Sequence, residues 1–413
     1  TVYGGSIIVA DAPNSSNFVL RVAGDIKLDA VNDIKLQNRI EAGWQTRNDI
    51  TLYSAQGLVL QSNAVGMLSD GVDSEALVAD DLSVHSAAGV DLRFLDVNTV
   101  TLSNTSSGAV ALTELAAGGD LDLGGISQVG AGSVSIATEG GALRVLSGGG
   151  IVSADAGAVS LTAGGTSSDL RVDAGVSVHG GRLSLTAARD VDVRALLSNT
   201  DGQISVEASG RDALLSAGLR TDGFILVNAL NDIVQADGQA MLAIGSSGLG
   251  AVNLFAGHDI RLSRVQADAN ALLEAKTGAI SDGLTGNLND SLGKVDTVVQ
   301  ARAENLIVRS GGLVLRAAAG IGSGAQHLLT EVAQLAASNQ GSGGMFITER
   351  DDLTVTGTHG TGSNAIDVSA ANPANLLDAS GALVLVSSTG SLTITGPIQV
   401  SGNLLLKTTA TGQ

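Results

Sequence analysis

The sequence predicts an all-β fold, a parallel β-helix (β-solenoid) with about 20 residues and three short strands in each turn. Similar phrases recur along the chain, as in DLRVDAGVSVHGGRLSLTA (169–187) and DVDVRALLSNTDGQISVEA (190–208). Of the 413 residues, 55 are Gly, 44% are hydrophobic and only 2% are aromatic. A core of this composition must be thin, because small and β-branched side chains build it.

Each repeat is expected to hold three strands. In the copy at 169–187, every second residue is apolar in three runs: Leu170 and Val172, Val176 and Val178, and Leu183 and Leu185. Alternation with a period of two places such residues on one face of a strand. Glycines between the runs indicate turns, where the backbone adopts positive φ.

The repeats also align with one another. They end at Ala187, Ala208, Ala229, Ala256 and Ala275. A β-sandwich does not require successive strands to recur in register, whereas in a coil each turn lies on the previous one, so equivalent positions favour similar residues. The predicted stacked core, with Ile204 over Leu183 and Ile225, consists of Leu183, Leu185, Ile204, Val206, Ile225 and Val227.

An aspartate opens each of these repeats. The residues are Asp169, Asp190, Asp212, Asp232 and Asp259. We expect them at structural corners of the coil, where a carboxylate can accept a nearby backbone N–H and fix the turn.

The repetition runs through most of the chain, which predicts a single continuous parallel β-helix over residues 1–413. The polar segment at 281–297 is expected to leave the coil as a protruding loop, and the turns at 55–115 are expected to be less regular. Residues 327–339 have apolar side chains at helical spacing, but strand is preferred there because clean alternation flanks the segment on both sides.

The charge and composition of the chain exclude several classes of binding partner and site. The chain has 41 acidic and 22 basic residues, a net charge of −19 at pH 7, and no basic cluster of the kind that binds nucleic acid. No apolar run approaches the length of a membrane span, so membrane insertion is not expected. The absence of Cys excludes thiolate zinc sites and cysteine nucleophiles. Since the sequence starts without Met or a signal peptide, we expect a processed chain or a fragment.

The segment LVLRAAAGIGSGAQHLLTEVAQLAASNQGSGGMFITERDDLTVTG (313–357) resembles the filamentous-haemagglutinin-like repeats of giant secreted bacterial adhesins and autotransporter-type proteins. The resemblance implies a right-handed β-helix that forms a non-enzymatic shaft or fibre of an adhesin, in the extracellular space at a bacterial cell surface. It also implies self-association end to end, or continuation into further repeats of a longer chain, and a host-surface or matrix receptor that is a glycan or a protein.

Two other functions remain open. One is a homopolymeric extracellular filament or sheath subunit. The other is a polysaccharide-processing β-helix enzyme, for which Asp120 and Asp122, Asp190 and Asp192, or Asp351 and Asp352 would be the acid and base. We favour corner and outward surface roles for these carboxylates. The aromatic residues suited to a sugar platform, which would make a small glycan site near one end, are only Tyr3, Trp44 and Tyr53.

No cofactor is expected, and calcium is the metal ion that best suits this acidic chain. Its candidate ligands are Asp120, Asp122, Asp190 and Asp192. The glycine–aspartate nonapeptide of calcium β-rolls is not found, so solvated turn aspartates are the simpler interpretation. The five histidines form no i, i+4 pair, which argues against zinc, and His258 is expected to be a corner residue.

Overall fold

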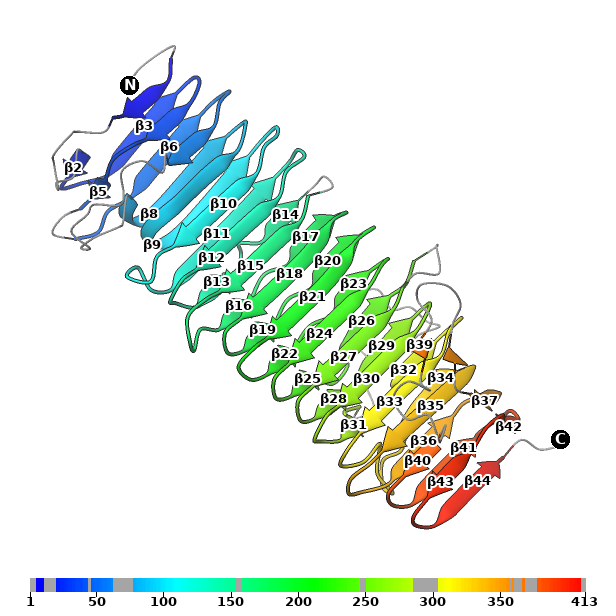
Figure 1. Cartoon of the computed structure of the whole chain (residues 1–413). Coiled ribbons are helices and arrows are strands. Elements are labelled where there is room, and N and C mark those ends of the chain that lie inside the picture. The colour runs from blue at the N-terminus through cyan, green and yellow to red at the C-terminus, as the bar shows by residue number, and fades with distance from the viewer. Residues whose placement is uncertain are drawn as a thin grey trace. The chain divides into compact units, whose positions relative to one another are not determined.

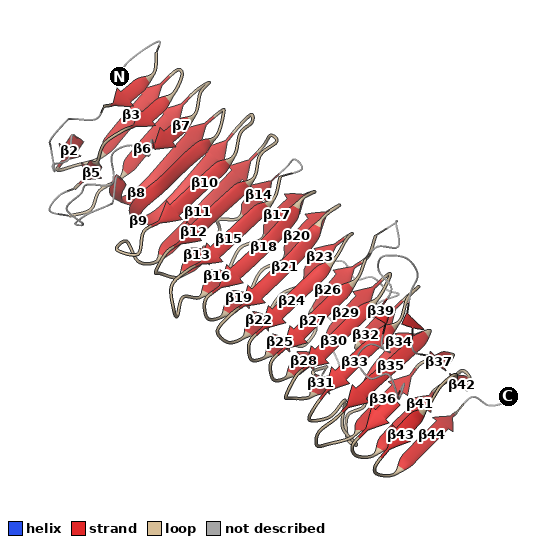
Figure 2. Ribbon diagram, viewed as in Figure 1, coloured by secondary structure: helices blue, strands red, loops and turns tan. Residues whose placement is uncertain are grey.

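The computed structural model describes residues 5–10, 20–43, 46–61, 77–153, 157–245, 250–284, 304–356, 358–359, 366–367 and 377–409. These residues form strands and turns and no helix (Figure 2). They fall into two compact units, Thr1–Ala195 and Leu196–Gln413. In each unit parallel strands stack as a β-solenoid, and the described strands of both units together make about 14 turns. The predicted fold class is therefore confirmed.

The first unit contains strands β1 to β19 (Figure 1). Those before residue 115 are β1 (Ile7–Val9), β2 (Leu20–Val22), β3 (Ile26–Ala30), β4 (Ile34–Leu36), β5 (Ile40–Ala42), β6 (Ile50–Ser54), β7 (Val59–Gln61), β8 (Leu77–Ser86), β9 (Val90–Asn104) and β10 (Val110–Glu114). The others are β11 (Leu121–Gln128), β12 (Val134–Thr138), β13 (Leu143–Val145), β14 (Ile151–Ser153), β15 (Val159–Ala163), β16 (Leu170–Val172), β17 (Val176–His179), β18 (Arg182–Ala187) and β19 (Val191–Val193).

The second unit contains strands β20 to β44. Those before residue 285 are β20 (Leu197–Thr200), β21 (Gln203–Ala208), β22 (Ala213–Leu215), β23 (Leu219–Thr221), β24 (Ile225–Ala229), β25 (Ile233–Gln235), β26 (Ala240–Ala243), β27 (Val252–Ala256), β28 (Ile260–Leu262), β29 (Arg264–Ala267), β30 (Ala271–Ala275) and β31 (Ile280–Asp282). The others are β32 (Leu306–Val308), β33 (Leu313–Ala317), β34 (Leu328–Val332), β35 (Gln334–Asn339), β36 (Met345–Glu349), β37 (Leu353–Val355), β38 (Thr358–His359), β39 (Ile366–Asp367), β40 (Leu377–Ala379), β41 (Leu383–Ser387), β42 (Leu392–Ile394), β43 (Ile398–Val400) and β44 (Leu404–Thr408).

In the regular part of each unit, a strand pairs in parallel with the strand three positions later, so three strands make one turn. In the first unit β12 pairs with β15 and β15 with β18, which aligns Val159 with Leu183 and Leu161 with Leu185. In the second unit β21, β24, β27, β30 and β33 form one such ladder. Two parallel strands need a connection that leads from the end of the first strand back to the end of the sheet where it began. Here the other two strands of the turn supply this connection.

The core is formed by the inward residues of these ladders. Ile204 is aligned with Ile225 and Val206 with Val227. All six residues of the predicted stacked core are fully buried: Leu183, Leu185, Ile204, Val206, Ile225 and Val227. The predicted contact between Ile204 and Leu183 would join the two units and stays a prediction, as does the single continuous coil.

The turns that contain β8 to β11 are less regular than those of β12 to β19. Strand β8 has 10 residues and β9 has 15, where three to six are usual elsewhere. The register shifts between Leu112 and Glu114 where β10 pairs with β9. A bulge of this kind bends the strand and lets one long strand pair with parts of two neighbours.

The sequence also predicts the structure of two single segments, residues 327–339 and 281–297. Residues 327–339, where helix and strand competed, form β34 and β35, so the preference for strand is confirmed. The predicted loop at 281–297 begins within β31 (Ile280–Asp282), and residues 285–297 lie outside the described part of the chain.

Candidate functional site

The corner aspartates connect each turn to the next. In four of the five, Asp169, Asp212, Asp232 and Asp259, a carboxylate oxygen accepts the backbone N–H of the equivalent residue one turn later, 20 to 27 residues along the chain. The pairs are Asp169 with Asp190 N (3.2 Å), Asp212 with Asp232 N (3.1 Å), Asp232 with Asp259 N (2.9 Å) and Asp259 with Ala279 N (2.7 Å). The same bond recurs in earlier and later turns, from Asp49 N to Asp25, Ala142 N to Asp120 and Ser391 N to Asp352. The carboxylate thus continues the parallel ladder across the bend.

The residue that precedes a corner aspartate reaches back to the corner aspartate of the previous turn. The pairs are Asn48 with Asp25, Arg189 with Asp169, Asn231 with Asp212 and His258 with Asp232. Their side chains all carry N–H donors, which suits a column of carboxylates. This second column was not seen in the sequence, because its members differ in type.

The candidate calcium ligands are placed beside arginines. Asp122 lies 2.8 Å from Arg144, which also lies 3.2 Å from Asp120. Asp192 lies 2.6 Å from Arg194, and Asp190 lies 3.3 Å from Arg189. Each of the four carboxylates thus has an arginine nearby, which Asp120 and Asp122 share, and calcium binding by these residues stays a prediction. Two of the three pairs considered as acid and base, Asp120 with Asp122 and Asp190 with Asp192, therefore lie in these ion pairs.

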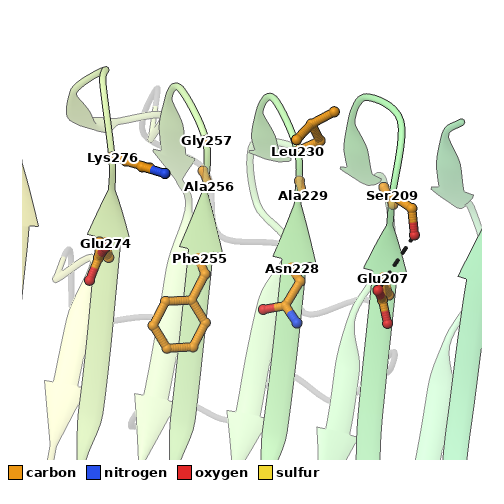
Figure 3. Close-up of a pocket in the computed structure, with 11 residues that line it drawn as sticks. Glu207, Ser209, Asn228, Ala229, Leu230, Phe255, Ala256, Gly257, Glu274 and Lys276 are labelled. Atoms are coloured by element: carbon orange, nitrogen blue, oxygen red, sulfur yellow. Dashed lines mark hydrogen bonds between the residues drawn. The ribbon is translucent and has the colours of Figure 1, made fainter.

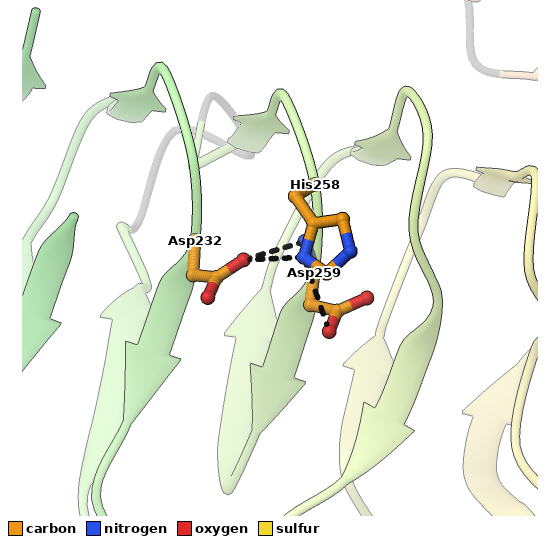
Figure 4. Close-up of side chains that lie close together, drawn as sticks. All are labelled: Asp232, His258 and Asp259. Carbon is orange, nitrogen blue, oxygen red and sulfur yellow. Dashed lines mark hydrogen bonds and ion pairs between the residues drawn. The ribbon is translucent and has the colours of Figure 1, made fainter. Parts of the chain in front are cut away.

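One group of three side chains has the spacing of metal ligands, and it is the only one within the described residues (Figure 4). Nδ1 of His258 lies 3.0 Å from Oδ1 of Asp232 and 3.3 Å from Oδ2 of Asp259. The hydrogen bond with Asp232 and the charges of the two carboxylates raise the pKa of His258 above its usual value. His258 is thus the corner residue that the sequence predicts, but it also joins two consecutive corners.

A shallow groove of about 350 Å³ lies on the outer face of strands β21, β24, β27 and β30 (Figure 3). Glu207, Asn228, Phe255 and Glu274 occupy aligned outward positions on successive strands along it. Three strand steps separate Glu207 from Glu274, about 14 Å at the usual strand spacing. An acid–base pair that cleaves a glycoside needs about 5 to 9.5 Å between its carboxyl groups, so these glutamates do not fit that chemistry.

A second groove of about 350 Å³ contains Glu331, Asp351 and Asp352. Glu331 is paired with Arg350 at 3.1 Å, and Asp352 accepts the backbone N–H of Ser391 at 2.6 Å. Of the three aromatic residues considered for sugar binding, Tyr53 stacks on His85 with ring centroids 4.5 Å apart, while Tyr3 and Trp44 lie outside the described residues. The first groove places Phe255 between two glutamates that are too far apart for glycoside cleavage, and the second has no aromatic residue in its lining.

Glu349 is a buried carboxyl that the sequence did not single out. It occupies the last position of β36, where most equivalent strands end in Ala, Ser or Thr. Burial raises its pKa to about 8, against the hydrogen bonds that it accepts from the Thr330 hydroxyl and from the backbone N–H groups of Val332 and Arg350. Glu114 ends β10 in the same way and accepts the backbone N–H of Val97 at 3.0 Å. Both side chains thus satisfy backbone donors of the preceding turn.

The described residues contain no helix long and apolar enough to cross a membrane. No family model, no curated protein and no solved structure matches this chain. The assignment to the parallel β-solenoids therefore rests on the strand pairing itself, and the resemblance to haemagglutinin-like repeats remains a prediction.

Proposed function

We propose that this chain is a non-enzymatic structural β-solenoid that forms a shaft or fibre of an adhesin at a bacterial cell surface. The observation that carries the proposal is the ladder of corner aspartates, which continues the hydrogen bonding across the bends of turn after turn. Together with in-register strand pairing, this ladder resists separation of the turns, because many parallel bonds must break at once. Outward side chains are then free to vary, and some would contact a glycan or protein receptor.

The distribution of outward charge favours this role over polysaccharide processing. An enzyme on this fold would gather unpaired carboxylates or basic groups in one groove. In the first of the grooves described above Glu274 is paired with Arg316 at 3.1 Å, and in the second Glu331 is paired with Arg350 at the same distance. Ion pairs of this kind suit a surface that must remain soluble and inert.

Electron microscopy of the purified chain tests the proposal most directly. Isolated rods would support a shaft, and compact globules would contradict it. Incubation of the same sample with acidic and neutral polysaccharides, followed by reducing-end analysis, tests the enzymatic alternative. Release of new reducing ends that a D351N/D352N variant abolishes would overturn the non-enzymatic role.

A homopolymeric filament is the second candidate, and the last described turn favours it. Leu404 continues the inward column of Leu383, yet it is 52% exposed whereas Leu383 is fully buried. This edge would accept another parallel turn, from a further repeat of a longer chain or from a second copy. Long unbranched fibres that form with rising protein concentration, and that the variant Leu404→Asp prevents, would favour the filament over the isolated shaft.

A further inference from the structure

We propose that Asp232, His258 and Asp259 bind a divalent transition-metal ion, with Zn²⁺ as the best-suited candidate, at a corner of the second unit. The site would offer one imidazole nitrogen and two carboxylate oxygens. This ligand set suits zinc, copper or nickel better than calcium, which prefers oxygen ligands alone.

The distances agree with coordination. Ligand atoms of the three residues all lie within 4.8 Å of one another, and Nδ1 of His258 is 3.0 and 3.3 Å from the nearest oxygens of Asp232 and Asp259. Ligands about 2.0 to 2.1 Å from a tetrahedral zinc ion lie about 3.3 Å from one another. The three donors therefore need only small shifts to surround an ion.

The backbone holds the two carboxylates in position. Oδ1 of Asp232 accepts the N–H of Asp259 at 2.9 Å, and Oδ1 of Asp259 accepts the N–H of Ala279 at 2.7 Å. Hydrogen bonds to ligating carboxylates orient them and increase metal affinity. Here the same bonds that define the coil also pre-organise the two acidic ligands.

This corner differs from the others in the residues around it. The equivalent of His258 is Arg189 or Asn231 in other turns, and neither side chain is a zinc ligand. The next turn supplies Gly278, so no side chain from that position can donate to Asp259 as Asn231 donates to Asp212. A bound cation would supply the positive charge that an arginine supplies elsewhere.

The cluster is also accessible. The side chain of His258 is 52% exposed and that of Asp259 is 45% exposed, so an ion can enter from solvent and water can complete its coordination. Binding would displace the proton shared between His258 and the carboxylates, because a metal-bound imidazole must be neutral. An ion held in this way would link two consecutive turns through their side chains.

Isothermal titration of the full chain, purified without a histidine tag, with Zn²⁺ alone tests the site. We expect one equivalent to bind, and Co²⁺ in its place to give the visible absorption of a low-coordinate cobalt centre. His258→Asn keeps an N–H donor toward Asp232, as Asn231 does toward Asp212, and should weaken binding tenfold or more. Asp259→Asn keeps the acceptor for Ala279 N–H and should have a similar effect.

His179→Asn is the matched control and should leave binding unchanged, because His179 is the exposed last residue of β17 and lies in the other unit. Urea midpoints of all variants establish that they are folded. Binding of Zn²⁺ that is unchanged in the variant at position 258 or in the variant at position 259 would overturn the proposal. So would absence of binding to the unmodified chain at millimolar Zn²⁺.

Discussion

At the residue scale, the corner aspartate gives each bend its hydrogen-bond partner. Asp212 accepts the N–H of Asp232 at 3.1 Å and the side-chain N–H of Asn231 at 2.8 Å. Burial acts to raise the pKa of Asp212, but these hydrogen bonds and the charge of Arg211 together outweigh it and lower the pKa. The ionised form is therefore the one that stabilises the fold.

Replacement of Asp212 by Ala should lower the free energy of unfolding by about 1 to 3 kcal/mol, because a partly buried backbone N–H loses a charged acceptor. Asp212→Asn keeps an oxygen acceptor and should cost less. Urea denaturation at pH 7 measures both variants. Because the pKa is lowered in the folded state, the advantage of the unmodified chain over D212N should decline as the pH falls through and below 3.8. Equal stabilities of D212A and the unmodified chain at pH 7 would contradict the assigned role.

The raised pKa of Glu349 gives the free energy of unfolding the opposite pH dependence. Its pKa is about 8 in the folded chain against an ordinary value of 4.5 for a glutamate side chain, so the folded state keeps the proton that the unfolded state releases. The stabilisation is complete below pH 4.5 and is lost as the pH rises toward 8, by up to about 1.4 kcal/mol for each pH unit.

Glu349→Gln should remove this loss, since the amide resembles the protonated acid and can keep the bonds to Thr330, Val332 and Arg350. Urea unfolding between pH 5 and 9 tests the prediction, with the exposed Glu207→Gln as control. A free energy of unfolding that varies with pH to the same extent in E349Q and in the unmodified chain would show that Glu349 does not titrate as described.

At the element scale, the short strands are specified by aligned columns. Ile225 of β24 lies between Ile204 of β21 and Val252 of β27, and all three are fully buried. Its neighbour Leu226 faces outward and is only half-buried. Substitutions at these two adjacent residues therefore distinguish the effect of core packing from that of strand propensity.

Ile225→Ala should destabilise the second unit by about 2 to 5 kcal/mol, because it removes buried methylene groups and leaves a cavity that rigid neighbouring turns cannot fill. Leu226→Ala should cost much less. Chemical denaturation followed by circular dichroism measures both. Similar losses from the two variants would contradict the inward and outward assignment.

Some turns between strands also depend on glycine. Gly108 has φ +86°, and a Cβ added there would collide with the carbonyl group of Ala88 in the preceding turn. Gly119 has a nearly identical φ of +85°, but a Cβ there would meet nothing within 4 Å. The two glycines differ only in how closely the neighbouring turn approaches.

Gly119→Ala should therefore cost about 1 kcal/mol from backbone strain alone, and Gly108→Ala should cost clearly more, because the turns must move apart. Thermal unfolding of the two variants provides the comparison. Equal melting temperatures would show that the close approach between turns does not affect the stability of the variants.

At the scale of the whole molecule, the chain combines a net charge of −19 with exposed ion pairs between arginines and aspartates. Exposed pairs contribute about 0 to 1 kcal/mol each, whereas the excess of like charge acts over long distances. Repulsion between acidic residues is then the larger electrostatic effect.

Raising NaCl from about 0.01 M to about 0.1 M shortens the screening length from about 30 to about 10 Å. We expect the melting temperature at pH 7 to rise over this range, because screening weakens the net repulsion more than the short-range ion pairs. Differential scanning calorimetry measures the effect. A fall in melting temperature would mean that the ion pairs dominate.

The fold class, the inward columns and the bends that carry the aspartates could all be predicted from the repeats alone. This is possible because stacking in register forces equivalent positions to carry similar residues, so that Leu183 and Ile204 can be identified as core positions without coordinates. Burial of these residues follows from period-two alternation, which is a local property of each strand.

The polar contacts between residues of different turns could not be predicted in this way. Asp232 and His258 are 26 residues apart, a distance set by the length of one turn that no local pattern specifies. The arginine partner of Asp122, the groove along Phe255 and the burial of Glu349 are likewise products of stacking. Turn lengths vary from one repeat to the next, so the side chains that become neighbours at a corner depend on the folded path of the chain.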